Sequence, residues 1–171
     1  MAEVGGICPV SPAKNFLNQA KNFLHFFTSK KNTLVQCAAL PFVICDDGMW
    51  VLLVTTRKTR RWILPKGWPK MGHSPHEIAA KEAFEEAGVK GCTFKDSIGS
   101  YSEKKRLHVF VSVPCNLNVY PLEVTEQHIH WREEAQRDRI WLPVKEAADR
   151  LSNKGLAQII VNFSNRWHCD K

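Results

Sequence analysis

The stretch "SPHEIAAKEAFEEAGV", residues 74–89, carries both ends of a predicted helix. Ser74 and Pro75, with Glu77 three positions after the serine, form a pattern that starts many helices. Gly88 is typical of a helix end, because glycine readily adopts the left-handed backbone found there. The pattern therefore predicts a helix over residues 74–87. Small side chains recur along it in a stripe that would let it lie close to a sheet: Ala79, Ala80, Ala83 and Ala87.

The last turns of this helix concentrate negative charge. Glu82, Glu85 and Glu86 fall on one face, because residues three and four apart on a helix are neighbours. Like charges at these spacings weaken an isolated helix, so we expect a positive group nearby, either solvated lysine side chains or a metal ion. Carboxylates held at the rim of a packed layer suit Mg²⁺ or Mn²⁺, which prefer oxygen ligands.

The segment before the helix is strongly basic. "RKTRRWILPKGWPK", residues 57–70, contains six basic residues and no acidic one. Basic side chains attract phosphate, and a metal held by carboxylates neutralises developing charge and activates water. The two segments together favour hydrolysis of a diphosphate linkage over a solvated helix face or a nonspecific nucleic-acid patch.

The remaining chain alternates strand and helix patterns. Strands are predicted at residues 33–45, 49–57, 62–65, 106–113 and 139–142, and further helices at 144–151 and 156–167. The turn signal at residues 46–48 makes the first two strands a hairpin. Interleaved elements of this kind predict an α/β fold, namely an α/β/α sandwich with a mixed β-sheet between helices.

The composition is that of one globular domain of 171 residues with a net charge of +7, which favours an anionic partner. No apolar run is long enough to span a membrane. Six scattered cysteines without a C-x-x-C pair favour reduced thiols in a cytoplasmic protein. Residues 1–32 form a separate N-terminal arm with a predicted amphipathic helix. That helix could pack on its own domain, serve as a transit peptide or lie on a membrane surface.

The stretch "GWPKMGHSPHEIAAKEAFEEAGV", residues 67–89, resembles the Nudix box, G-x5-E-x7-R-E-U-x-E-E-x-G-U, in which U is a bulky aliphatic residue. The matching positions are Gly67, Glu82, Glu85, Glu86, Gly88 and Val89, with Ala83 as a small apolar residue at the first U. Two positions depart from the motif: His73 replaces its first glutamate and Lys81 its arginine. In the family these positions support the geometry of the helix, and lysine cannot make the two-pronged contact of arginine with a carboxylate. Other segments resemble the diphosphoinositol-polyphosphate phosphohydrolase branch and its bacterial relatives: "RWILPKG", "EKKRLHVFV" and "QRDRIWLPVKEAAD".

The resemblance implies that residues 33–171 form a Nudix hydrolase domain that uses Mg²⁺ or Mn²⁺. The box glutamates are then catalytic, with Glu86 and Glu82 as the first choices of ligand and Glu85 as a further or water-mediated one. The main-chain carbonyl of Lys66 is expected to join them. The general base stays open between Glu82 and a later acid: Glu123, Glu126 or Glu134. The candidate phosphate-binding residues are Arg57, Lys58, Arg60, Arg61, Lys66, Lys104, Lys105 and Arg106.

The leading hypothesis is metal-dependent hydrolysis of a diphosphate linkage, by water attack on phosphorus, in a highly anionic substrate. Diphosphoinositol polyphosphates and dinucleoside polyphosphates carry enough charge; single nucleotides and nucleotide sugars are the alternatives within the enzyme class. The competing class is a catalytically silent Nudix-like module that binds nucleotide or RNA. The intact glutamates argue against that class, whereas His73 and Lys81 argue for it. RNA binding would also need stacking aromatic rings beside the basic residues, for which Trp62 and Trp68 are the candidates.

Overall fold

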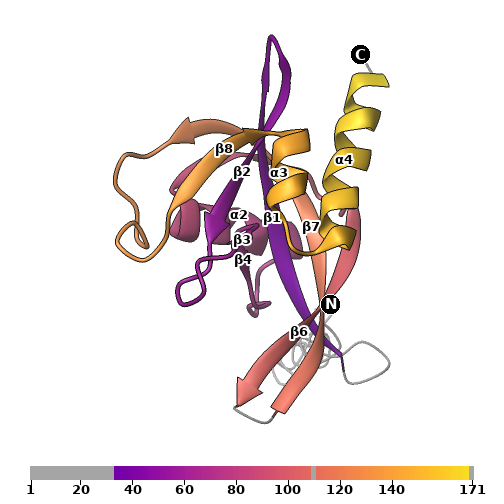
Figure 1. The fold of residues 1–171 in the computed structure, drawn as a ribbon. Helices are drawn as coiled ribbons and strands as arrows, with labels where there is room; N and C mark the ends of the chain where they lie inside the picture. The colour runs from indigo at the N-terminus through magenta and orange to yellow at the C-terminus, as the bar shows by residue number, and fades with distance from the viewer. Residues whose placement is uncertain (1–32, 109–110, 170–171) are drawn as a thin grey trace, which may run out of the picture.

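A mixed β-sheet forms the centre of the computed structural model, which describes residues 33–108 and 111–169 (Figure 1). Its strands are β1 (Leu34–Cys45), β2 (Gly48–Thr55), β3 (Trp62–Ile63), β4 (Lys66–Gly67), β5 (Val89–Thr93), β6 (Gly99–His108), β7 (Val111–Gln127) and β8 (Arg139–Pro143). The main order is β3-β2-β1-β7-β5, while β4 pairs with β1, β6 with β7 and β8 with β2. β1 and β2 form the predicted antiparallel hairpin, whereas β1 and β7 run parallel, so the sheet is mixed as predicted.

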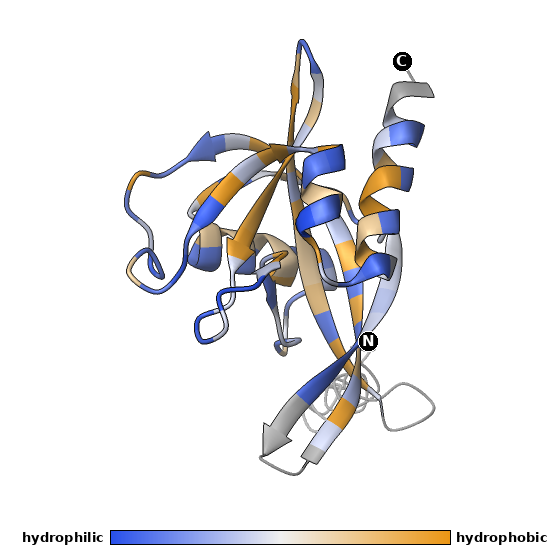
Figure 2. Ribbon diagram, in the orientation of Figure 1, coloured by the Kyte–Doolittle hydropathy of each residue, from blue (hydrophilic) through white to orange (hydrophobic). Residues whose placement is uncertain are grey.

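Helices cover both faces of this sheet. α2 (Pro75–Ala87) packs on one face, and α3 (Val144–Arg150) and α4 (Lys154–Cys169) lie on the other (Figure 1). β1 supplies both cores, because successive side chains of a strand point to opposite faces: Cys37 and Ala39 face α2, whereas Ala38, Leu40 and Phe42 face α3 and α4. Figure 2 shows the hydrophobic residues concentrated along the central strands and hydrophilic ones in the projecting loops. The predicted α/β/α sandwich is therefore confirmed.

The ends of α2 are built as the sequence predicts. The backbone N–H of Ser74 donates to the Glu77 carboxylate at 2.7 Å, which closes the first turn. Gly88 has φ +67, in the left-handed region, and its N–H donates to the Phe84 carbonyl at 3.0 Å. The buried alanines at 79, 83 and 87 let this helix approach β1 closely. These local features fix where the glutamate-bearing face of α2 begins and ends.

One predicted strand was wrong, and two short strands, β4 and β5, were not predicted. The single strand predicted at 106–113 is divided between β6 and β7, which pair antiparallel with Arg106 opposite Ser112. β5 was missed because it has only five residues and carries a central glycine, a residue type that is depleted in strands. The amphipathic helix expected within residues 1–32 lies outside the described residues. Among the helices that are described, none combines the length and apolar character needed to cross a membrane.

We predict that Gly88→Ala destabilises the fold by roughly 2 kcal/mol, measured by urea denaturation. Left-handed backbone costs an alanine about 1 kcal/mol or more. An added Cβ at Gly88 would also lie 2.8 Å from the Cβ of Trp131, which adds overpacking. Gly72→Ala is the matched control, since Gly72 has φ +80 but no atom within 4 Å of the added Cβ. Equal losses in the two variants would contradict a role for the Trp131 contact.

Candidate active site

A cavity of about 950 Å³ lies between the carboxylate face of α2, the segment joining β2 to β3, and β6. Segments far apart in the sequence meet around it, including Arg137 from the β7–β8 connection and Asn153 from the α3–α4 connection. Eight cationic side chains line it: Arg57, Lys58, Arg61, Lys66, Lys70, Lys104, Lys105 and Arg137. Three acidic side chains line it: Glu82, Glu86 and Glu103. The cavity is therefore strongly positive, with its carboxylates concentrated along α2.

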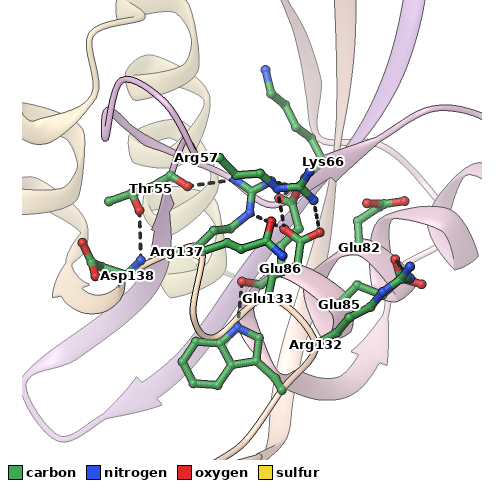
Figure 3. A network of polar contacts seen from close by, with 12 residues as sticks. Thr55, Arg57, Lys66, Glu82, Glu85, Glu86, Arg132, Glu133, Arg137 and Asp138 are labelled. Atoms are coloured by element: carbon green, nitrogen blue, oxygen red, sulfur yellow. Dashed lines mark hydrogen bonds and ion pairs between the residues drawn. The ribbon is translucent and has the colours of Figure 1, made fainter.

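The three box glutamates do not share one environment. Glu82 and Glu86 line the cavity, whereas Glu85 does not. The Glu85 carboxylate instead lies 3.4 Å from the ammonium of Lys81 and 2.8 Å from the guanidinium of Arg132. Figure 3 shows Glu85 with Arg132, apart from the network around Glu86.

Of the eight predicted phosphate-binding residues, six are among the described residues that line the cavity. Arg57, Lys58 and Arg61 reach the cavity from the β2–β3 connection, and Lys66, Lys104 and Lys105 reach it from β4 and β6. Arg60 does not line the cavity; it bonds the Gln136 carbonyl and pairs with Asp138. Arg106 lies on β6, and its side chain is outside the described part of the structure.

Glu86 is the most enclosed of the acids in the cavity, with only 5% of its surface exposed. One carboxylate oxygen accepts from the guanidinium of Arg137, and the other accepts from the backbone N–H of Lys66 at 3.2 Å (Figure 3). Burial raises the pKa of the Glu86 carboxyl to about 7, against the opposing effect of Arg137. A buried carboxylate of this kind is held charged only by positive groups in contact with it.

Glu82 approaches the sheet because the strand opposite it carries a glycine. A Cβ added at Gly67 would lie 2.2 Å from the Glu82 carboxyl carbon and from its Oε1. The first glycine of the box therefore leaves room for this carboxylate against β4. Burial raises the pKa of Glu82, and the ammonium of Lys70, 3.5 Å away, opposes that rise.

These residues fit Mg²⁺ or Mn²⁺ by their chemistry. Glu82 and Glu86 offer hard oxygen donors on the same wall, and the absence of a side chain at Gly67 lets the Glu82 carboxylate lie against β4. Within residues 33–108 and 111–169, no three acidic, histidine or cysteine side chains converge on one point. Mg²⁺ does not need such a cage, since it is commonly bound by one or two carboxylates together with water and substrate phosphate.

The C-terminal end of α2 is held by side chains that sequence reasoning missed. The indole N–H of Trp131 donates to the carbonyl of Glu86 at 3.1 Å, and Arg139 donates to the carbonyl of Ala87 at 2.6 Å. The Arg139 guanidinium lies 3.9 Å above the Trp131 ring. These contacts satisfy carbonyls that a helix end leaves without partners, and they fix the backbone that carries Glu86.

A buried ion-pair network behind Glu86 was also missed. Arg137 contacts both Glu86 and Glu133, and Glu133 also pairs with Arg57 (Figure 3). Although burial alone would raise it, hydrogen bonds from Arg137 and Arg57 hold the pKa of the Glu133 carboxyl below its ordinary value. One signal in the sequence is the spacing of Glu133 and Arg137, which lie four residues apart in the connection between β7 and β8.

Lys105 and Trp68 form a pair at the rim of the cavity. The ammonium of Lys105 lies 4.4 Å from the centroid of the Trp68 ring. Burial, with a smaller contribution from the neighbouring Lys66, lowers the pKa of Lys105. Lys66 itself pairs with Glu103, an acid that the sequence analysis did not single out. Lys105, unlike Lys66, has no acidic partner among the described residues, so its ammonium is a candidate contact for an anion.

The acids proposed as a general base on later segments lie elsewhere. Glu123, Glu126 and Glu134 do not line the cavity. Glu126 pairs with His128 at 2.9 Å and Glu134 with His130 at 3.0 Å. His128 and His130 lie in the connection between β7 and β8, beside these two carboxylates. Of the candidates named from the sequence, Glu82 alone faces the cavity.

Curated proteins with similar sequences include Nudix hydrolase 16, mitochondrial, of Arabidopsis thaliana. It is 32% identical over 124 residues, which cover 71% of this chain and 68% of that protein. Diphosphoinositol polyphosphate phosphohydrolase 2 of Rattus norvegicus is 35% identical over 114 residues, covering 66% of this chain and 59% of that protein. Two further Arabidopsis relatives, Nudix hydrolases 21 and 13, are matched over 57% and 61% of their own lengths.

Solved structures share the fold at low sequence identity. The C. elegans Ap4A hydrolase matches with a TM-score of 0.58 at 13% identity, covering 79% of this chain and 98% of that one. The NUDIX domain of Shewanella oneidensis NrtR, solved with ADP ribose, matches with a TM-score of 0.60 at 17% identity, covering 92% and 99%. Residues 36–163 also match the NUDIX domain family, so the resemblance seen in the box extends over most of the described fold. The chain belongs to the Nudix hydrolase family.

Proposed function

We propose that this protein hydrolyses a diphosphate linkage in a compact, highly phosphorylated substrate of the diphosphoinositol-polyphosphate type, using Mg²⁺ or Mn²⁺. The observation that carries the proposal is the charge of the cavity, where eight cations face three acids. Lys58, Arg61, Lys104 and Lys105 have no ion pair with any acid in the described part of the chain. Cations that gather in a hollow without acidic partners are expected to bind an anion.

The aromatic lining of the cavity supports a substrate without a nucleobase. Trp68 is the single aromatic residue among the described lining residues, and Lys105 covers its ring. Trp62, the second stacking candidate, packs on the core beneath α3 and α4 instead. Recognition of a base or of single-stranded RNA normally uses a free ring face. Phosphate groups, in contrast, would meet the Lys105 ammonium directly.

Different residues of the cavity would bind the metal, orient the phosphates and accept a proton in such a reaction. Glu82 and Glu86, with the main-chain carbonyl of Lys66, would hold the metal beside the cationic wall. Bound Mg²⁺ or Mn²⁺ supplies Lewis-acid stabilisation of phosphate oxygens and lowers the pKa of water. Arg57, Arg61 and Lys104 would orient the phosphates, and the proton of the attacking water would pass to an acid facing the cavity. Glu82 and Glu103 are the two acids of the cavity that lie outside the Arg137 network, so either could accept this proton while Arg137 stays bound to Glu86.

The first experiment measures phosphate release from a panel of substrates with Mg²⁺, with Mn²⁺ and with chelator. The panel holds diphosphoinositol polyphosphates, dinucleoside polyphosphates, ADP-ribose, nucleotide sugars, nucleoside triphosphates and triphosphorylated RNA. We expect metal-dependent turnover that is fastest on the diphosphoinositol polyphosphates. Preference for a nucleotide would contradict the substrate assignment, and absence of turnover on every compound would support the silent binding module.

Substitution of the individual box glutamates tests the metal assignment. Glu86→Gln should lower turnover by roughly 100-fold or more, because a metal contributes several kcal/mol of transition-state stabilisation. Glu85→Gln is the matched control and should lower turnover by less than about 10-fold, since Glu85 faces Lys81 and Arg132 rather than the cavity. The two variants are compared with wild type by their initial rates, measured at saturating substrate over a series of Mg²⁺ concentrations. An equal or larger loss of turnover in Glu85→Gln would show that Glu82 and Glu86 are wrongly assigned as the metal ligands.

Lys105→Met should raise KM for the preferred substrate by ~10-fold with little change in kcat, because a charge-assisted contact to phosphate contributes about 1.5–3 kcal/mol. Lys90→Met is the control: Lys90 also lies over an aromatic ring, 4.7 Å from the centroid of Phe84, but it does not line the cavity. Steady-state kinetics at two salt concentrations give the readout. A KM unchanged in Lys105→Met would place the phosphates elsewhere.

A further inference from the structure

The position that the Nudix box gives to arginine is filled here by Lys81, which does not line the cavity. Its ammonium lies 3.4 Å from the Glu85 carboxylate, and its side chain is 43% exposed. A lysine on the surface makes a weak and easily solvated pair, and it lacks the planar fork of a guanidinium. The geometry of Glu86 therefore depends on a partner from another part of the chain.

A guanidinium reaches Glu86 from the segment between β7 and β8. Arg137 donates to the Glu86 carboxylate, to the Glu133 carboxylate at 2.6 Å and to the Thr55 carbonyl at 2.8 Å (Figure 3). The partners belong to α2, to the same turn and to β2, so they hold the guanidinium from three directions. Because the guanidinium is planar and rigid, these contacts fix the direction of the N–H that Glu86 accepts on one oxygen, while the Lys66 N–H holds the other oxygen.

Glu133 anchors Arg137 within its own turn. The backbone N–H of Arg137 donates to the Glu133 carbonyl at 3.1 Å, which brings the two side chains together on one side. Both are buried, with 7% of Glu133 and 9% of Arg137 exposed. Arg132 in the same segment is exposed and pairs with Glu85, outside the cavity. The turn therefore directs one of these two arginines inward and the other outward.

We infer that Arg137, anchored by Glu133, is the positioning residue for Glu86 and takes the part that the arginine of the box plays elsewhere in the family. Glu86 is then held by two contacts, the Arg137 guanidinium on one oxygen and the Lys66 N–H on the other. Both oxygens retain a lone pair for a cation in the cavity. The inference rests on the proposed function in one respect, that Glu86 is a metal ligand.

The test is Mn²⁺ binding without substrate, followed by electron paramagnetic resonance, in wild type, Arg137→Lys, Glu133→Gln and Arg132→Lys. Arg137→Lys keeps the charge but loses the fork, and should weaken Mn²⁺ binding by about 10-fold or more, the usual effect of removing a group that orients a ligand. Glu133→Gln should also weaken Mn²⁺ binding, because it removes the charged group that anchors Arg137. Arg132→Lys makes the same chemical change outside the cavity and should leave the affinity within about 2-fold. Circular dichroism checks that each variant is folded.

Kinetics add a second readout on the same variants. Loss of positioning lowers kcat and leaves KM nearly unchanged, whereas loss of a phosphate contact would raise KM. Wild-type affinity for Mn²⁺ in both Arg137→Lys and Glu133→Gln overturns the inference, and so does an equal loss in Arg132→Lys. If Arg137→Lys does not fold, Glu133→Gln decides. Wild-type protein that binds no Mn²⁺ refutes the metal assignment itself, while weakened Mn²⁺ binding without any turnover refutes only the proposed reaction.

Discussion

The contact of the buried Glu86 carboxylate with the Arg137 guanidinium is the interaction on which the site depends. Removing one partner of a buried pair would leave an uncompensated charge, at a cost of about 3–5 kcal/mol. The structure meets this constraint by bringing the turn that follows β7 back against α2, where Trp131 and Arg139 bind the last carbonyls of the helix. One end of α2 and the back wall of the cavity are thus built by the same part of the chain.

Close approach of α2 to the sheet is the second condition, and glycine and alanine provide it. The alanines at 79, 83 and 87 are fully buried against β1, and Gly67 leaves space for the Glu82 carboxylate. Cations from the β2–β3 connection and from β6 then meet these carboxylates across the cavity. A positive wall facing a carboxylate wall is the arrangement that the diphosphate hydrolysis we propose requires.

The sequence predicted α2 closely, because its signals are local: Ser74 and Pro75 begin it and Gly88 ends it. It predicted most of the cationic wall, because these residues cluster in two short segments. It missed the Arg137–Glu86 contact, which joins residues 51 positions apart. A contact between residues this far apart produces no periodic pattern in the sequence. It also misread residues 106–113, where polar side chains on β6 hide the pairing of two long strands.

The most direct measurement is an anomalous difference map from a crystal of this protein soaked in Mn²⁺. We predict one strong peak in the cavity within bonding distance of Glu82 and Glu86, with Arg137 still bound to Glu86. We expect no Mn²⁺ on Glu85. A peak coordinated by Glu85 with Arg132 displaced, or an empty cavity at saturating Mn²⁺, would contradict it.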